Sequence, residues 1–146
     1  MNAAYVHLTL NIFPPVLELA GLAVLAVSIA VRSRGAMRTA LSLLVASSLL
    51  AVPVYLSGEP AEGLVKGLDG VTTSAIHPHE EAAEFAFIVL IVQGLLALAA
   101  LLLSRRRELP SWALIVIVIV TVAGTAAIAR TAFLGGKIHH PESGMR

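Results

Sequence analysis

Cysteine is absent from this chain of 146 residues, and its absence excludes several kinds of site. The chain forms no disulfide, offers no thiolate to a metal ion and cannot by itself ligate an iron–sulfur cluster. The redox compartment in which the protein works therefore cannot be inferred from cysteine usage.

Charged residues are also scarce, at 13% of the chain against 58% for hydrophobic residues. Mean hydropathy is +0.89, far above that of a soluble domain. A soluble fold is therefore disfavoured, and the formal net charge of +1 gives no sign of nucleic-acid binding. We find no hydrolase nucleophile motif, no phosphate-binding loop and no chain of acidic residues like those of proton pumps.

Four stretches are apolar and long enough to cross a bilayer, whose hydrocarbon core takes about 20 helical residues. We place these spans at residues 5–31, 39–57, 80–104 and 111–134. They leave no room for a second domain, so residues 1–146 are expected to form a single transmembrane domain. Because helices satisfy their own backbone groups in lipid, the expected fold is an all-α, antiparallel four-helix transmembrane bundle. Small residues in every span allow close helix contact, and Gln93 is expected to hydrogen-bond between helices.

The distribution of basic residues predicts the orientation of this bundle. Two short connections are rich in arginine, whereas the opposite side carries scattered basic residues: Arg32, Arg34, Arg38, Arg105, Arg106 and Arg107 against Lys66, Lys137 and Arg146. By the positive-inside rule, the arginine-rich connections face the cytoplasm. Both termini and the long middle loop then face outwards, which in a bacterium is the periplasmic side of the inner membrane. The outward segments hold all five histidines: His7, His77, His79, His139 and His140.

The first span carries a predicted polar stripe. His7, Asn11 and Glu18 fall within about 40° of one another if the helix is unbroken. Such a helix begins near residue 3 and is kinked by the pair Pro14–Pro15.

Glu18 lies at a depth where an ionisable side chain is costly and marks a functional site or a partner. The predicted partner is Arg130, near the outer end of the fourth span. Two alternatives stay open, namely an ion pair that only fixes the register of the bundle, and a protonated Glu18.

The third and fourth spans bring further histidines to the outer face. His79 follows Pro78 at the start of the third helix, and the next two residues are glutamates that complement the helix dipole. The fourth helix is expected to end at Gly135–Gly136, which would turn His139 and His140 across the opening of the bundle.

Three histidine-bearing segments on one face indicate a haem or metal site, because imidazole is the commonest metal ligand and the usual axial ligand of haem. The first hypothesis is a haem b held by two imidazoles and serving respiratory-type electron transfer, with Arg130 or Lys137 meeting the propionates. Its candidate residues are His7, Asn11, His79, Arg130, Lys137 and His140. Neutral imidazole is the binding form, so occupancy should fall below about pH 6.5.

The second hypothesis is a bare copper, zinc or iron ion in a metal-handling membrane protein. The ligands would be the three histidines together with a carboxylate: His7, His79 and His140 with Glu62, Glu80 or Glu142. The third hypothesis is a structural accessory subunit of a larger membrane complex. The pattern favours a cofactor-binding or electron-transfer protein over a stand-alone catalyst.

Four ordered motifs resemble those of a bacterial four-helix transmembrane family catalogued as domain of unknown function 2231. They are His7-x-x-x-Asn11-x-Phe13-Pro14, Tyr55-Leu56-Ser57-Gly58-Glu59-Pro60-Ala61-Glu62, His79-Glu80-Glu81-Ala82 and Leu134-Gly135-Gly136-x-Ile138-x-His140-Pro141-Glu142. The resemblance covers essentially the whole chain. It implies a respiratory setting, because similar domains occur fused to Rieske-type and cytochrome c-type modules. The partners to expect are a quinol or a periplasmic cytochrome or Rieske-type protein, in a homo-oligomer or a larger complex.

The chain departs from this family pattern at two positions. Members often have a second histidine where this chain has Ile12, and an arginine where it has His139. The first departure puts a role for position 12 in doubt, and the second makes His140 the better candidate of its pair. We assign His77 and His139 as bystanders or supporting groups.

Overall fold

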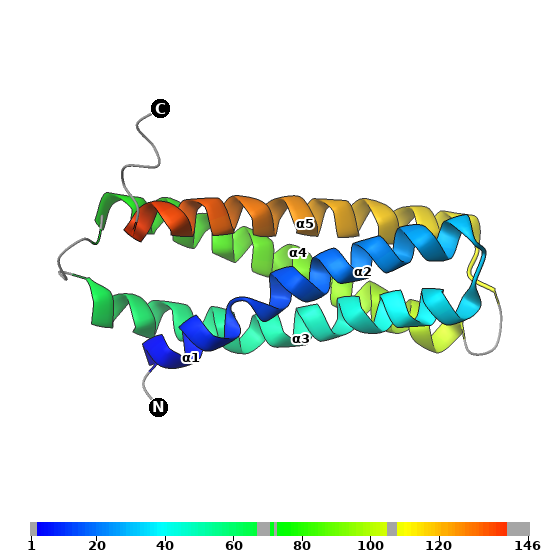
Figure 1. Cartoon of the computed structure of the whole chain (residues 1–146), viewed down its shortest axis with the longest axis horizontal. Coiled ribbons are helices and arrows are strands. Elements are labelled where there is room, and N and C mark those ends of the chain that lie inside the picture. Colours follow the sequence, from blue (N-terminus) through cyan, green and yellow to red (C-terminus); the bar gives the residue numbers. More distant parts are fainter. Residues whose placement is uncertain (1–2, 67–70, 72, 105–107, 140–146) are drawn as a thin grey trace.

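The computed structural model describes residues 3–66, 71, 73–104 and 108–139, and nearly all of them are helical. Four long helices run antiparallel to one another, and a short helix precedes the first of them (Figure 1). The elements are α1 (Ala3–Leu10), α2 (Phe13–Ala30), α3 (Arg34–Val65), the 3₁₀ turn η1 (Thr73–Ala75), α4 (Ile76–Leu103) and α5 (Ser111–His139).

The four helical spans expected from the sequence are confirmed. The segments Ala3–Ala30, Arg34–Leu64, Thr73–Leu103 and Ser111–Ile138 are each long and apolar enough to cross a membrane. Many large apolar side chains lie on the outside of the bundle, among them Leu19, Val27, Leu49, Leu56, Ile88, Leu95, Ile119 and Val122. A water-facing surface would leave these side chains solvated, whereas lipid accommodates them. The chain is therefore a multi-pass membrane protein.

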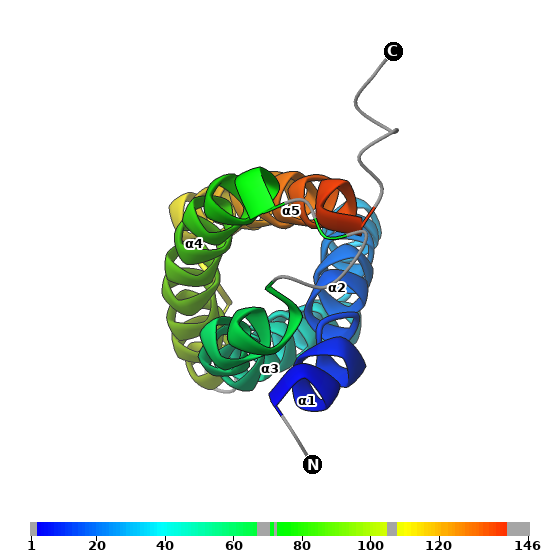
Figure 2. The same cartoon turned by 90° about the vertical axis from the view of Figure 1, so that its left-hand side faces the viewer.

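The helices form a closed ring in which each long helix contacts the next and α5 returns to α2 (Figure 2). Helix α1 lies outside this ring against α3. One half of the bundle is packed by an apolar cluster of Leu25, Ala40, Leu41, Leu44, Ala97, Ala100 and Ile117. Small residues in this cluster bring the backbones close together, as the sequence indicated.

The first span is broken, which corrects the continuous polar stripe predicted above. Helix α1 ends at Leu10, a turn follows, and Pro14 and Pro15 begin α2 instead of interrupting a longer helix. Proline is favoured in the first helical turn because its missing N–H has no helical partner there. The break removes the shared register, so that Asn11 is exposed in the turn while Glu18 is fully buried.

Three other helix ends differ from the predicted ones. Helix α4 begins at Ile76, before His77 and Pro78, and α3 continues to Val65, past the end at 57 expected from hydropathy. Helix α5 runs through Gly135 and Gly136 to His139, so the predicted helix end at this glycine pair is wrong. The position of His140 lies outside the described residues.

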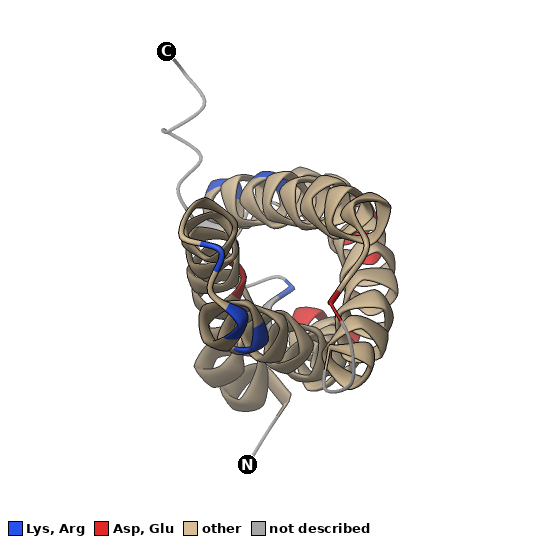
Figure 3. Ribbon diagram, turned by 90° about the vertical axis from the view of Figure 1, so that its right-hand side faces the viewer, with Lys and Arg blue, Asp and Glu red and all other residues tan. Residues whose placement is uncertain are grey.

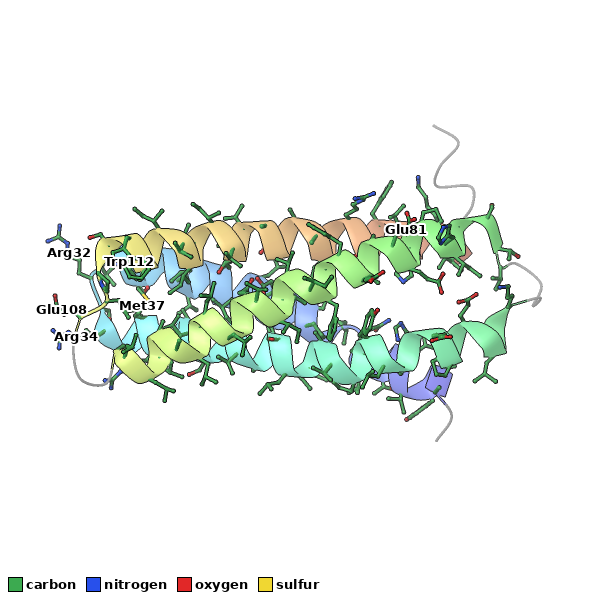
Figure 4. The ribbon with its side chains drawn as sticks, turned by 180° about the vertical axis from the view of Figure 1, so that it is seen from behind. Arg32, Arg34, Met37, Glu81, Glu108 and Trp112 are labelled. Atoms are coloured by element: carbon green, nitrogen blue, oxygen red, sulfur yellow. The ribbon has the colours of Figure 1, made fainter. Side chains whose placement is uncertain are left out.

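The end of the bundle that carries the α2–α3 turn is basic (Figure 3). Arg34 pairs with Glu108 across to the α4–α5 connection (Figure 4). Arg38 donates to the carbonyl of Ser104 at 3.0 Å. The Arg34 guanidinium holds the pKa of the Glu108 carboxyl below its ordinary value. These bonds tie the two connections together. The arginines at 105–107 lie outside the described residues.

Candidate functional site

Helix α1 and the start of α4 lie at the end of the bundle opposite the arginines, together with the end of α5 (Figure 1). His7 lies in the last turn of α1, and its Nδ1 is 3.0 Å from the carbonyl oxygen of Val54 in α3. Because a carbonyl only accepts, Nδ1 must carry the ring proton. The other ring nitrogen, Nε2, is then the one with the lone pair.

His79 is held in the same way by a different helix. Its Nδ1 lies 3.0 Å from the carbonyl oxygen of Thr131 in α5, so Nδ1 donates and Nε2 keeps the lone pair. The ring packs against Gly135, where an added Cβ would lie only 3.0 Å from Cε1 of the imidazole. The missing side chain at Gly135 therefore lets the His79 ring approach the α5 backbone. Gly135 has this role instead of ending the helix, as the sequence had predicted.

The structure thus brings together two of the three predicted histidine ligands. His7 and His79 lie near enough to interact electrostatically, although 71 residues separate them in the sequence. Neither Nε2 atom has a hydrogen bond within the part of the chain that the structure describes. Fixing Nδ1 on a carbonyl is how proteins orient an imidazole whose Nε2 binds a metal. The third candidate, His140, lies outside the described residues, as does Glu142.

Carboxylates gather at the same end of the bundle. Glu62 near the end of α3 and Glu80 at the start of α4 lie close enough to interact with each other. Lys66 bonds Glu62 at 3.0 Å. Among the described residues, however, no group of three or more histidine or acidic side chains is arranged to hold a metal ion.

The remaining candidates do not join the two histidines. Asn11 is exposed in the turn after α1, and Arg130 is exposed on α5. The ammonium of Lys137 lies 4.5 Å from the centre of the Phe133 ring, and that ring is itself exposed. His77 lies 3.5 Å from Glu81, a contact between two exposed side chains. The role of Arg130 or Lys137 at the propionates of a haem near the outer surface stays a prediction.

A second polar group lies deeper, and it corrects the predicted partner of Glu18. The Glu18 carboxylate accepts a hydrogen bond of 2.8 Å from the Gln93 amide, and none of the ion pairs of the described residues includes Glu18. The expected interhelical role of Gln93 is thereby confirmed. Ser47 of α3, which the sequence analysis missed, also reaches the Glu18 carboxyl and is fully buried.

An aromatic pair between α3 and α4 also escaped the sequence analysis. Tyr55 and Phe87 stack with ring centroids 4.2 Å apart and planes 4° from parallel. Tyr55 follows Val54, the residue that accepts the His7 bond, so the stack ties α3 to α4 close to the histidine pair. The apolar residues of a membrane-spanning helix give no sign of such a contact, because the contact depends on which faces of the two helices meet.

No family model matches the chain, and no curated protein or solved structure matches it either.

Proposed function

We propose that the protein is an integral membrane redox protein in which His7 and His79 would hold a haem b through their Nε2 atoms. The supporting observation is that two histidines from different helices lie near each other at one end of the bundle. The Nδ1 of His7 is held on a carbonyl of α3, and that of His79 on a carbonyl of α5. Both imidazoles therefore offer the nitrogen that ligates iron. These two nitrogen donors are the feature of the site that fits a haem iron.

The number of donors favours haem over a bare ion. A porphyrin fills four positions around iron, so the protein needs to add only two axial imidazoles. A bare zinc site takes three or four protein ligands, and the described residues bring no third histidine or acidic side chain to the pair. When bound, haem iron supplies one-electron transfer, and the chain contributes the orientation of the two rings and their protonation state.

A bare copper, zinc or iron ion is the second candidate function. The Glu62 and Glu80 carboxyls supply the observation that favours it, because they meet at the same end of the bundle and are carried by α3 and α4. A shift of either carboxyl towards His79 would complete a nitrogen and oxygen ligand set.

We place the histidine end on the periplasmic side of a bacterial inner membrane, with both termini on that side. The basis is the arginine-rich end of the bundle and the positive-inside rule. A quinol in the membrane and a periplasmic cytochrome or Rieske-type protein are the partners that this orientation allows. We also propose that the chain is a member of the family catalogued as domain of unknown function 2231.

The orientation predicts the result of reporter insertions. Alkaline phosphatase, which is active only outside the cytoplasm, should be active after Lys66 in the α3–α4 connection and inactive after Leu109 in the α4–α5 connection. The opposite pattern would place the histidines in the cytoplasm. They would still share one end, but the proposed periplasmic partners would be wrong.

The cofactor content of protein purified from membranes tests the function itself. Extraction as a pyridine haemochrome measures haem, and elemental analysis of the same sample measures copper, zinc and iron. Haem in near-stoichiometric amount supports the first proposal, and stoichiometric metal without haem supports the second. Protein that carries neither after expression with added haem precursor and metals leaves a structural subunit as the better account.

A further inference from the structure

The buried layer around Glu18 has properties that the histidine pair does not explain. Glu18 has no exposed surface, and Gln93 is 1% exposed. The side chains from the neighbouring helices that reach the carboxyl are neutral, namely Ser47 from α3 and Gln93 from α4, and Gly124 of α5 faces both. A carboxylate without a cation at this depth is costly.

The hydrogen atoms available to this layer do not balance its acceptors. The Gln93 amide donates one bond to Oε2 of Glu18. The Ser47 hydroxyl has a single hydrogen, which it donates to the carbonyl of Pro14 at 3.0 Å. Oε1 of Glu18 and Oε1 of Gln93 are left buried without a donor among the described residues.

These two oxygens both lie beside Gly124. A Cβ built on Gly124 would lie 2.6 Å from Oε1 of Gln93 and 3.2 Å from Oε1 of Glu18. The absence of a side chain at Gly124 is what admits both atoms. Two buried acceptors beside one glycine are costly to leave unpaired, and a hydrogen or a cation between them would satisfy both.

We propose that Glu18 and Gln93 form a proton-binding site in the middle of the membrane, independent of the cofactor. The proton resides on Oε1 of Glu18 and is donated to Oε1 of Gln93, while the Gln93 amide donates to Oε2 of Glu18. One proton satisfies both stranded oxygens and removes the buried charge. Loss of the proton leaves a carboxylate with one donor, so release requires water or a movement of α5 at Gly124.

A proton fits this layer better than a metal cation does. Hard cations take about six oxygen ligands, whereas the unpartnered buried side-chain oxygens among the described residues are those of Glu18, Gln93 and Thr121. The proton needs only the two oxygens beside Gly124.

Infrared spectroscopy of the full chain in liposomes at neutral pH tests this site. The wild type should show the carbonyl band of a neutral carboxylic acid, with a small shift in D₂O, and Glu18→Gln should lose that band. The side-chain amide that this substitution introduces can make both bonds of the protonated acid, so the melting temperature of the variant in detergent should match that of the wild type. Gln93→Leu should keep the acid band but move it to higher frequency, because the hydrogen bond to the acid is lost.

A matched pair of glycine variants locates the site. Gly124→Ala should shift the acid band and lower the melting temperature, whereas Gly136→Ala, which meets open space on the same helix, should do neither. A wild type without the acid band overturns the proposal. If its melting temperature then rises with sodium chloride but not with choline chloride, and Glu18→Gln abolishes the difference, the layer is a sodium site. Without such a rise, Glu18 is a buried carboxylate.

Discussion

Replacing His79 with alanine is expected to reduce bound cofactor from near-stoichiometric to near zero. The imidazole supplies one of the two nitrogens gathered at the histidine end, and no other described histidine or acidic side chain is placed to replace it. Haem extraction and elemental analysis of the purified variant measure the loss. His7→Ala should behave in the same way. Gly135→Ala should weaken binding without removing a ligand, because its methyl group pushes the His79 ring from the Thr131 carbonyl.

His77→Ala is the matched control for this experiment. His77 lies two residues from His79 and on the same helix, but its ring is exposed and contacts Glu81. The variant should therefore keep the full amount of cofactor. Full cofactor in both His7→Ala and His79→Ala would end the ligand assignment. Equal losses in His77→Ala and His79→Ala would show that cofactor content follows general damage to this end of the bundle.

Gly94→Ala is expected to destabilise the bundle by about 1–3 kcal/mol. A Cβ at this position would lie 2.2 Å from Oγ and 2.4 Å from Cβ of Ser48 on α3. Ser48 is buried, and rotation of its side chain moves Oγ but not the Cβ that α3 holds in place, so the two helices must separate. Chemical denaturation in mixed detergent micelles measures the change.

Gly136→Ala again provides the control, since the substitution is identical and the surrounding space is open. Alanine has the higher helix propensity, so this change should be neutral or stabilise the protein by up to about 1 kcal/mol. If the two substitutions change the stability in opposite directions, the loss in Gly94→Ala comes from the contact between the helices and not from helix propensity. An equally small effect at both positions would contradict the close packing of α3 on α4.

The number and the approximate positions of the spans could be predicted from the sequence, because apolar runs of bilayer length have few alternative structures. The residues at which the helices end could be predicted less well. Hydropathy ends the second span at about residue 57, yet α3 continues to Val65, since a helix can leave the membrane without changing its backbone. The pair Pro14–Pro15 suits either a kink or a helix start, and only the packing of α1 on α3 decides between them.

The candidate site was predictable in its residue types but not in its contacts. The topology places His7 and His79 at one end of the bundle, and this much follows from counting spans. The carbonyl partners of these rings are backbone atoms of Val54 and Thr131, and any residue type offers a carbonyl, so no pattern of side chains marks them. Gly135 illustrates the same limit, because a glycine near a helix end predicts a C-cap more readily than a contact with a ring.

The partner of Glu18 was mispredicted because depth alone does not decide which helix faces meet. Arg130 lies at a similar expected depth, but its side chain is exposed on α5, while Gln93 and Gly124 face the carboxyl. An ion pair with Arg130 would have made Glu18→Gln destabilising, because the substitution would strand the arginine. Since the pair does not form, a neutral residue at position 18 is expected to be tolerated.

Electron paramagnetic resonance of the oxidised, haem-loaded protein in liposomes tests most directly whether His7 and His79 are the two axial ligands of an iron. The account predicts a low-spin ferric signal typical of two imidazole ligands in the wild type and in His77→Ala. Any haem retained by His79→Ala should give a high-spin signal, because one axial ligand is gone. A wild type that binds no iron under these conditions, or a low-spin signal that persists in both His7→Ala and His79→Ala, would contradict the account.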